Sequence, residues 1–201
     1  MIGHLIAWLK KCFNRPNYSS RKKKWLGALT WLITVGGSGL ITYIVMKVTT
    51  VNYYLYMIVG TYLSYTCISA RQLAIEAEKI MKSLKQNNLK KARQQVGMIV
   101  GRDTNQLSAE EVTKATIETV AENTSDGVIA PLFFLVIGGP VLGIMYKAIN
   151  TLDSMIGYQN EKFRAFGEVS ARIDDIANYV PARITWLLLI ISSWLLRDDT
   201  R

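Results

Sequence analysis

The chain has 201 residues, half of them hydrophobic and 19% charged, which is enough for one domain and excludes a disordered chain. The net charge of +9 does not indicate a nucleic-acid partner, because the basic residues are not interleaved with aromatic residues that stack on bases. They gather in "KKCFNRPNYSSRKKK", residues 10–24, which holds seven Lys/Arg and no acid. Such a cluster beside a spanning helix is typical of cytoplasmic orientation and of contact with anionic lipid.

Two long apolar runs follow the basic segment. Residues 25–46 contain 22 positions without a charge, and residues 51–70 contain 20. Each run is long enough to cross a hydrocarbon core of ~30 Å as a helix. Residues 71–127 are polar, with nine Lys/Arg and eight Asp/Glu. Because basic segments flank the pair of runs on both sides, we predict that both flanks are cytoplasmic.

The polar region 71–127 has the pattern of helices. Ser108 and Glu111 fit a capping box, in which a serine begins a helix and a glutamate follows three residues later. The helix that they open carries Glu118 and Glu122 one turn apart on one face. We expect it to end at "TSDG", where Gly127 suits a turn with positive φ.

The apolar segment 128–149 has "GGP" at its centre, and proline disfavours helix at the residue before it. The segment is either one kinked span or two half-helices that form a re-entrant hairpin. We favour the hairpin, which would bring "NTLDS" (150–154) to face "ENTSD" (122–126). Polar residues 150–183 follow, and then an apolar helix at 184–196 that is short for a span. The predicted fold is therefore an all-α, polytopic integral membrane protein with a single domain over 1–201.

Three polar groups stand at the borders of these apolar segments. Carboxylates beside amide and hydroxyl oxygens are ligands that Mg²⁺ prefers, and Mg²⁺ usually arrives with phosphate, which arginine and lysine bind. The alternative is that these residues only cap helices. The groups are Glu118, Glu122, Asn123, Ser125 and Asp126; Lys147, Asn150, Asp153 and Ser154; and Arg172, Asp174, Asp175, Asn178 and Arg183.

Three stretches in this order, "ENTSDGVIAPLFF", "YKAINTLDSMIGY" and "FGEVSARIDDIANYVPARIT", resemble the CobD/CbiB family of cobalamin-biosynthesis membrane proteins, the adenosylcobinamide-phosphate synthases. The resemblance extends from "IGHLIAWLKK" to "VPARIT". It implies an ATP- and Mg²⁺-dependent enzyme of the cell membrane that joins adenosylcobyric acid to aminopropanol or its phosphate, with its motifs facing the cytoplasm. It also implies that the family begins upstream and continues beyond residue 201, so we expect either a chain truncated at both ends or a shortened homologue.

The resemblance supplies the motif positions, and the chemistry of the side chains suggests their roles. We expect catalytic roles for Glu122, Asp126 and Asp153, and metal binding by Asp126, Asp174 and Asp175. Substrate or nucleotide binding is expected of Asn123, Ser125, Lys147, Asn150, Arg172 and Arg183. Two other functions stay open: an ion-coupled transporter, which also uses broken helices, and a non-catalytic membrane scaffold for corrinoid enzymes.

Overall fold

The computed structural model describes residues 2–100, 103–158 and 163–196, which form helices and connecting turns without any strand. This confirms the all-α prediction. The elements are α1 (Ile2–Phe13), α2 (Ser20–Trp31), η1 (Leu32–Gly36), α3 (Gly37–Thr49), α4 (Tyr53–Cys67), α5 (Ala70–Lys85), α6 (Leu89–Gly97), α7 (Ala109–Thr124), η2 (Ser125–Ile129), α8 (Ala130–Ile156) and α9 (Glu168–Leu195).

Within the part of the chain that the structure describes, three helical stretches are long and apolar enough to cross a membrane: Ser20–Thr49, Ala109–Ile156 and Glu168–Leu195. The first contains the predicted span 25–46. The third joins the polar third motif to the apolar run 184–196 in one helix that continues through Pro181, so that run is not a separate short helix. In the predicted span 51–70, α4 forms a continuous helix of 15 residues, about 22 Å long at ~1.5 Å per residue.

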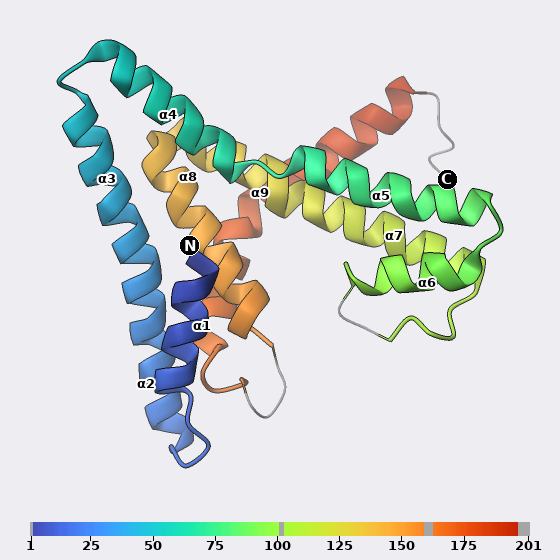
Figure 1. Cartoon of the computed structure of the whole chain (residues 1–201), viewed down its shortest axis with the longest axis horizontal. Coiled ribbons are helices and arrows are strands. Elements are labelled where there is room, and N and C mark those ends of the chain that lie inside the picture. The colour runs from blue at the N-terminus through green and yellow to red at the C-terminus, as the bar shows by residue number, and fades with distance from the viewer. Residues whose placement is uncertain (1, 101–102, 159–162, 197–201) are drawn as a thin grey trace.

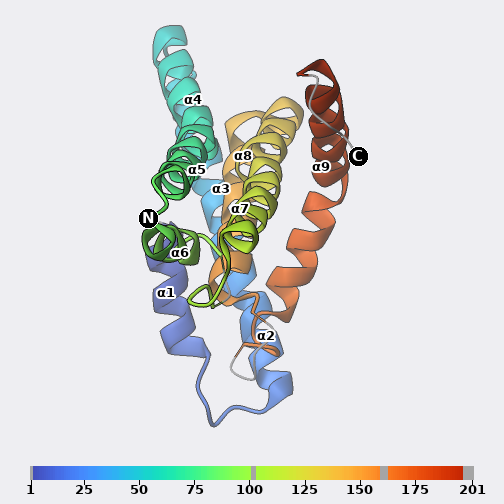
Figure 2. The same ribbon diagram turned by 90° about the vertical axis from the view of Figure 1, so that its right-hand side faces the viewer.

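The helices fall into two groups. Figures 1 and 2 show α2, η1 and α3 as one long rod, with α1, α8 and the start of α9 beside it. The other group is α5, α6 and α7, which pack on one another beyond the end of α4. The chain passes from the first group to the second through α4 and returns to the first group through η2. These two connections meet at the polar motifs.

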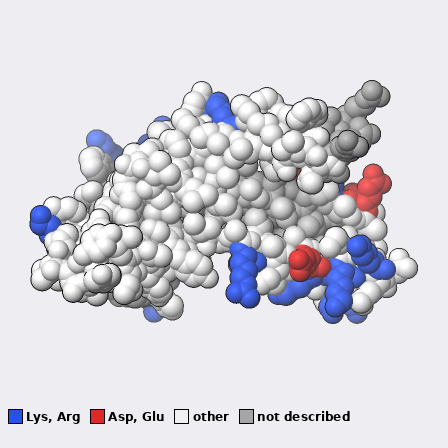
Figure 3. Space-filling model, turned by 90° about the horizontal axis from the view of Figure 1, so that it is seen from above, with Lys and Arg blue, Asp and Glu red and all other residues white. Residues whose placement is uncertain are grey.

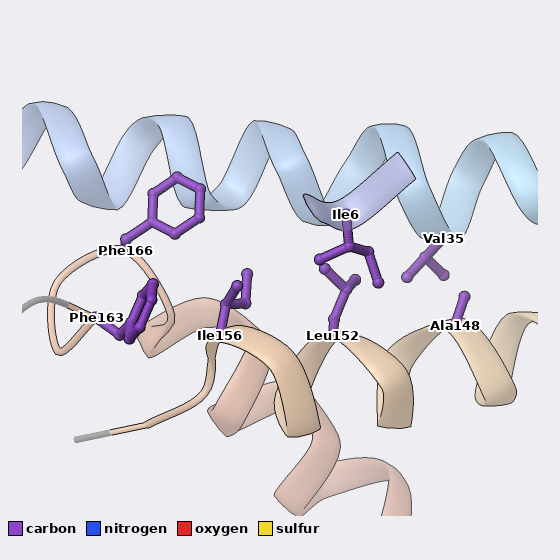
Figure 4. Packing of buried hydrophobic residues seen from close by; sticks show 7 residues of the cluster. All are labelled: Ile6, Val35, Ala148, Leu152, Ile156, Phe163 and Phe166. Carbon is purple, nitrogen blue, oxygen red and sulfur yellow. The ribbon is translucent and has the colours of Figure 1, made fainter. Parts of the chain in front are cut away.

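The core of the first group holds the second arm of α8 in place. This arm is the half of α8 that follows Pro140, where the helix is broken. Figure 4 shows the buried side chains of Ile6 from α1 and Val35 from η1 facing Leu152 and Ile156 of α8, and Phe166 covers the end of the cluster. Burying a side chain of this size contributes about 1.5–3 kcal/mol. The opposite face of this arm carries the polar residues of the second motif, which the core therefore holds in place.

The second group has its own small core, made by Ile80 of α5, Ala92 and Val96 of α6, and Val112 and Ala115 of α7. The predicted capping box begins α7. The Ser108 N–H donates to Glu111 Oε2 at 2.7 Å, and the Glu111 N–H donates to Ser108 Oγ at 3.2 Å.

The chain reverses direction inside α8. Gly138 (φ −142°, ψ 24°) and Gly139 (φ 59°, ψ −156°) are not helical, and the positive φ of Gly139 is one that glycine adopts readily. The rings of Phe134 and Tyr146 stack with centroids 5.0 Å apart, although twelve residues of straight helix would separate them by about 18 Å. These contacts confirm the hairpin that "GGP" predicted.

The predicted turn at Gly127 is wrong. α7 does not end at "TSDG", because a π-helical turn, η2, carries the chain directly into α8. Gly127 has no positive φ; among the described glycines only Gly139 does. The Gly127 carbonyl instead accepts a hydrogen bond of 2.8 Å from the Ser69 N–H. A single π-helical turn of this kind is frequent at functional sites.

Because α8 forms a hairpin, we predict that reagents reach the first two motifs from the same side of the membrane. Asn123→Cys and Ser154→Cys are suitable probes, since both side chains are exposed, whereas Ser125 is buried. We expect an impermeant thiol reagent to modify both cysteines only after cells are permeabilised. Modification of the two from opposite sides would contradict the hairpin, and modification of both in intact cells would contradict the cytoplasmic orientation.

Candidate functional site

A cleft of about 520 Å³ lies between the α7–η2 helix and the second arm of α8. Glu118, Glu122 and Asp126 follow one another at intervals of four residues, which places them on one face of that helix. The arm of α8 supplies Asn150 and Asp153 to the same cleft. The cleft therefore has acidic and amide side chains from two separate motifs on its walls.

Asp126 is the residue at which these motifs touch. The Asn150 Nδ2 donates to Asp126 Oδ2 at 3.2 Å, although 24 residues separate the two. The half-buried Asp126 carboxylate makes this contact instead of capping a helix, because η2 continues the helix on both sides. The prediction that "NTLDS" faces "ENTSD" is confirmed.

A second, smaller cleft of about 250 Å³ adjoins the first and shares Asp126, Asn123 and Asn150 with it. Lys147 lies in this cleft, where its Nζ donates to Ser69 Oγ at 3.0 Å. Ser69 begins α5 but its side chain makes no capping hydrogen bond. No acid pairs with Lys147 within the described residues. The nearby Asp126 carboxylate interacts with this ammonium group only at longer range, and a partly buried ammonium group in a cleft is suited to binding an anionic ligand.

Ser69 and Gln72 also line the smaller cleft, and neither residue was predicted from the sequence. Ser69 lies at the end of the second apolar run and Gln72 just after it, both far along the chain from the polar motifs. No local pattern marks them, and the hydrogen bond from the Ser69 N–H to the Gly127 carbonyl joins this part of the chain to η2 at the site.

The third motif lies behind the cleft and supports it. The Asn178 Nδ2 donates to Asp174 Oδ2 at 3.0 Å, and the hydroxyl of Tyr146 donates to Asn178 Oδ1 at 2.8 Å. The same hydroxyl lies 3.3 Å from the Asp126 carbonyl oxygen. This network links α9, α8 and η2, and the fully buried Tyr146 at its centre was not predicted from the sequence.

The donors around Asp126 fit a magnesium ion of the kind that arrives with a phosphate ligand. The carboxylates of Asp126, Asp153 and Asp174 are close enough for their charges to repel one another, and a cation would relieve this repulsion. Asp174 Oδ1 is buried without a hydrogen-bond partner among the described residues. No three acidic, cysteine or histidine side chains in the described ranges form a complete metal site. Mg²⁺ needs only one or two carboxylates when phosphates supply further ligands.

Besides Asp174, which lies behind the clefts, four residues with predicted roles line neither cleft. Arg172 is exposed and pairs with Glu168 at 2.8 Å, and Arg183 donates to the carbonyl of Tyr179 at 2.6 Å. Their phosphate-binding role is therefore not supported by the geometry. The inward face of α9 carries Asp174, which places Arg172 on another side of the helix. The other two are Asp175, which is exposed on α9, and Ser125, which is buried in η2.

Tyr146→Phe tests the network behind the cleft. Phenylalanine keeps the stacking on Phe134 but leaves Asn178 Oδ1 without its donor, so we expect the free energy of unfolding to fall by about 1–2 kcal/mol. Thermal denaturation of the purified protein in detergent measures this. Tyr62→Phe on α4, where the side chain is exposed, is the control and should change little. Equal stability of the two variants would contradict the network.

Known proteins resemble the chain over its whole length. A family model described as "CobD/Cbib protein" matches residues 1–201. The "Cobalamin biosynthesis protein CobD" of Listeria monocytogenes serotype 4b (strain F2365) is 54% identical over 100% of this chain and 64% of its own length. The CobD of Streptococcus sanguinis (strain SK36) is 53% identical over 98% of this chain and 64% of its length.

A third relative, the "Cobalamin biosynthesis protein CbiB" of Salmonella arizonae (strain ATCC BAA-731 / CDC346-86 / RSK2980), is 44% identical over 98% of this chain. The chain spans 62–64% of the length of these three relatives. No solved structure matches it. Since the family model covers every residue, the chain belongs to the CobD/CbiB family.

Proposed function

We propose that this chain acts in cobalamin biosynthesis, as a membrane enzyme that joins a carboxylate of adenosylcobyric acid to aminopropanol or its phosphate, using ATP and Mg²⁺. The names of the relatives support the pathway. The observation that carries the proposal is the contact between Asn150 and Asp126, through which the hairpin joins two motifs in one polar cleft.

The chemistry needs an activated carboxylate, because a carboxylate does not react with an amine at neutral pH. Transfer of the terminal phosphoryl group of ATP to the corrinoid carboxylate gives an acyl phosphate and ADP. Attack by the amine on this acyl phosphate forms the amide, releases phosphate and leaves one proton to be removed. When bound, Mg²⁺ neutralises charge on the phosphoryl group that is transferred.

The residues of the larger cleft suit these steps. Asp126, held by Asn150, and Asp153 supply the carboxylates that would hold the metal ion. Glu122 is exposed in the same cleft, where a carboxylate can accept a proton from the substrate ammonium group and so free the amine for attack. Tyr146 acts indirectly, since its hydroxyl lies against the carbonyl of Asp126, and Asp174 is linked to this hydroxyl through Asn178.

Lys147 is the candidate contact for a phosphate group. A hydrogen bond to a charged group contributes about 1.5–3 kcal/mol, so Lys147→Met should raise the KM of a phosphorylated substrate by roughly 10- to 100-fold. Lys47→Met is a matched control, because Lys47 lines a different cleft at the tip of the hairpin. Equal KM values for the two variants would remove Lys147 from the site.

The test of the function is whether the protein in membranes releases ADP in a corrinoid-dependent manner. We expect adenosylcobyric acid, the amine, ATP and Mg²⁺ together to yield an amide-linked product, detected by mass spectrometry. The proposal would be overturned if ADP release did not depend on the corrinoid or if no amide-linked product formed. The scaffold and the transporter would then be the remaining candidate functions.

The transporter is the weaker alternative on geometric grounds. Transporters of this kind bind their substrates beside the broken part of a helix, near the centre of the membrane. Here the break at Gly138 and Gly139 adjoins Tyr43 and Lys47 at the α3–α4 end, whereas Asp126 and Asn150 lie at the opposite end of the hairpin. The acidic residues and the break are therefore separated along both arms.

A further inference from the structure

We propose that the α5–α6–α7 unit lies on the surface of an anionic bilayer, with an apolar groove between α5 and α7 facing the acyl chains. The basic end of α5 and α6 would contact the lipid headgroups. This inference concerns a surface away from the Asp126 cleft and does not depend on the proposed reaction.

The groove has a volume of about 600 Å³ and is lined mainly by apolar side chains. Met81 and Leu84 come from α5, Ile117 and Val120 from α7, and Leu189 from α9. Ile117 is 64% exposed, Met81 49% and Leu189 43%. Large apolar side chains that are gathered in this way mark a surface that something else covers.

One wall of the groove belongs to a helix that is long and apolar enough to cross the membrane. Leu189 lies in "WLLLII", residues 186–191 of α9, and all six side chains of this run are exposed. In a membrane, this run of α9 is surrounded by acyl chains. Because the groove opens onto the same run, acyl chains beside α9 also reach Ile117 and Met81.

The charge of the unit favours lipid as the occupant. Residues 79–93, "KIMKSLKQNNLKKAR", hold six Lys/Arg and no acid. Figure 3 shows Lys and Arg side chains gathered at the end of the molecule where α5 lies, while much of the remaining face is uncharged. A basic residue near an anionic leaflet contributes about 1 kcal/mol of attraction. A second copy of this chain, with the same basic segment, would be repelled.

The form of α5 agrees with a position at the interface. Its buried residues Ile80 and Ser83 face the α6–α7 core, Met81 lines the groove, and Lys82 and Lys85 are exposed near its end. Long lysine side chains lay their stems along apolar surface while the ammonium groups reach the headgroups. The same helix therefore offers contacts to both layers of a bilayer surface.

A spin label at Ile117→Cys tests the groove, in a background with Cys12→Ser; Cys67 is buried. The protein is placed in vesicles of phosphatidylcholine with phosphatidylglycerol, and collisions with oxygen and with a nickel chelate are compared. We expect the label to collide with oxygen and to be shielded from the chelate. A label at Lys114→Cys, exposed on the same helix outside the groove, should collide readily with the chelate.

Two outcomes at residue 117 would overturn the proposal. Ready collision with the chelate would mean that the groove faces water. Shielding from both reagents would mean that protein covers it.

The headgroup contact is tested by replacing Lys85, Lys90 and Lys91 together with glutamine. We expect the chelate collision rate at residue 117 to rise several-fold in anionic vesicles. Replacing Lys22 and Lys23, in the other basic cluster, should leave this rate unchanged. An unchanged rate in the triple variant, or an equal rise in the control, would show that the 79–93 segment does not hold the unit on the lipid.

Discussion

Asp126→Asn is expected to slow amide formation by about 10²–10³-fold, because the loss of one electrostatic group in an active site commonly has an effect of that size. Asparagine has nearly the same shape and keeps one acceptor oxygen, so the hydrogen bond from Asn150 at 3.2 Å can persist. The charge that would hold Mg²⁺ and its nucleotide is lost. Product formation from adenosylcobyric acid, the amine, ATP and Mg²⁺ in membranes measures the effect.

Asp103→Asn is the matched control for this substitution. Asp103 is exposed and, among the described residues, accepts hydrogen bonds from Asn105 within its own loop, so its replacement should leave the rate unchanged. Membrane insertion and protein level should stay the same in both variants, since neither side chain is packed among apolar residues. A normal rate for correctly inserted Asp126→Asn would rule out the metal-binding role.

If the unmutated protein makes no amide at all, the Asp126 result cannot be obtained and the proposed function itself fails. The Ile117 spin-label experiment is separate from both, because it reads the surroundings of the α5–α7 groove without any substrate. The two proposals can therefore be distinguished by experiment.

The hairpin could be predicted from the sequence because its cause is local. Proline at 140 supplies no N–H, and the two glycines before it adopt backbone angles that break the helix. Once the chain reverses there, two polar stretches equidistant from the break must meet, and Asn150 does contact Asp126. The capping box of α7 was predictable for the same reason, since its two residues lie three positions apart.

The remaining parts of the site depend on contacts between distant segments. Ser69 reaches Lys147 only because the α4–α5 connection packs against η2. The buried face of α9 is chosen by its neighbours, and this choice places Asp174 inside and Arg172 outside. Composition showed that both residues are polar and charged, but not which of them the packing would bury.

The prediction of a turn at Gly127 is wrong for a related reason. "TSDG" contains residues that favour turns in isolation, yet the apolar stretch after it continues a helix that packs on α4 and α9. The helix continues through these polar residues by means of one π-helical turn instead of ending. Tertiary packing therefore overrode the local preference at the position where the site is built.

Gly27→Ala is expected to destabilise the protein by about 3 kcal/mol or more, at the upper end of the effects of overpacking. Gly27 is buried in α2, where an added methyl group would overlap the backbone carbonyl oxygen of Phe166. A backbone atom cannot rotate away, so α2 would have to separate from the start of α9. This would also weaken the ion pair of 2.9 Å between Lys24 and Glu168.

The control for this substitution is Gly37→Ala in α3, the continuation of the same long helix. Nothing lies within 4 Å of the added methyl group at Gly37, and alanine favours helix over glycine by about 1 kcal/mol, so this variant should be as stable as the parent or slightly more. Thermal unfolding in detergent compares the two. Because α9 carries Asp174 and Asn178, Gly27→Ala should also lower activity in the fraction that stays folded. If Gly27→Ala unfolds at the same temperature as Gly37→Ala, α2 does not pack against the turn before α9, and the third motif is held behind the cleft by other contacts.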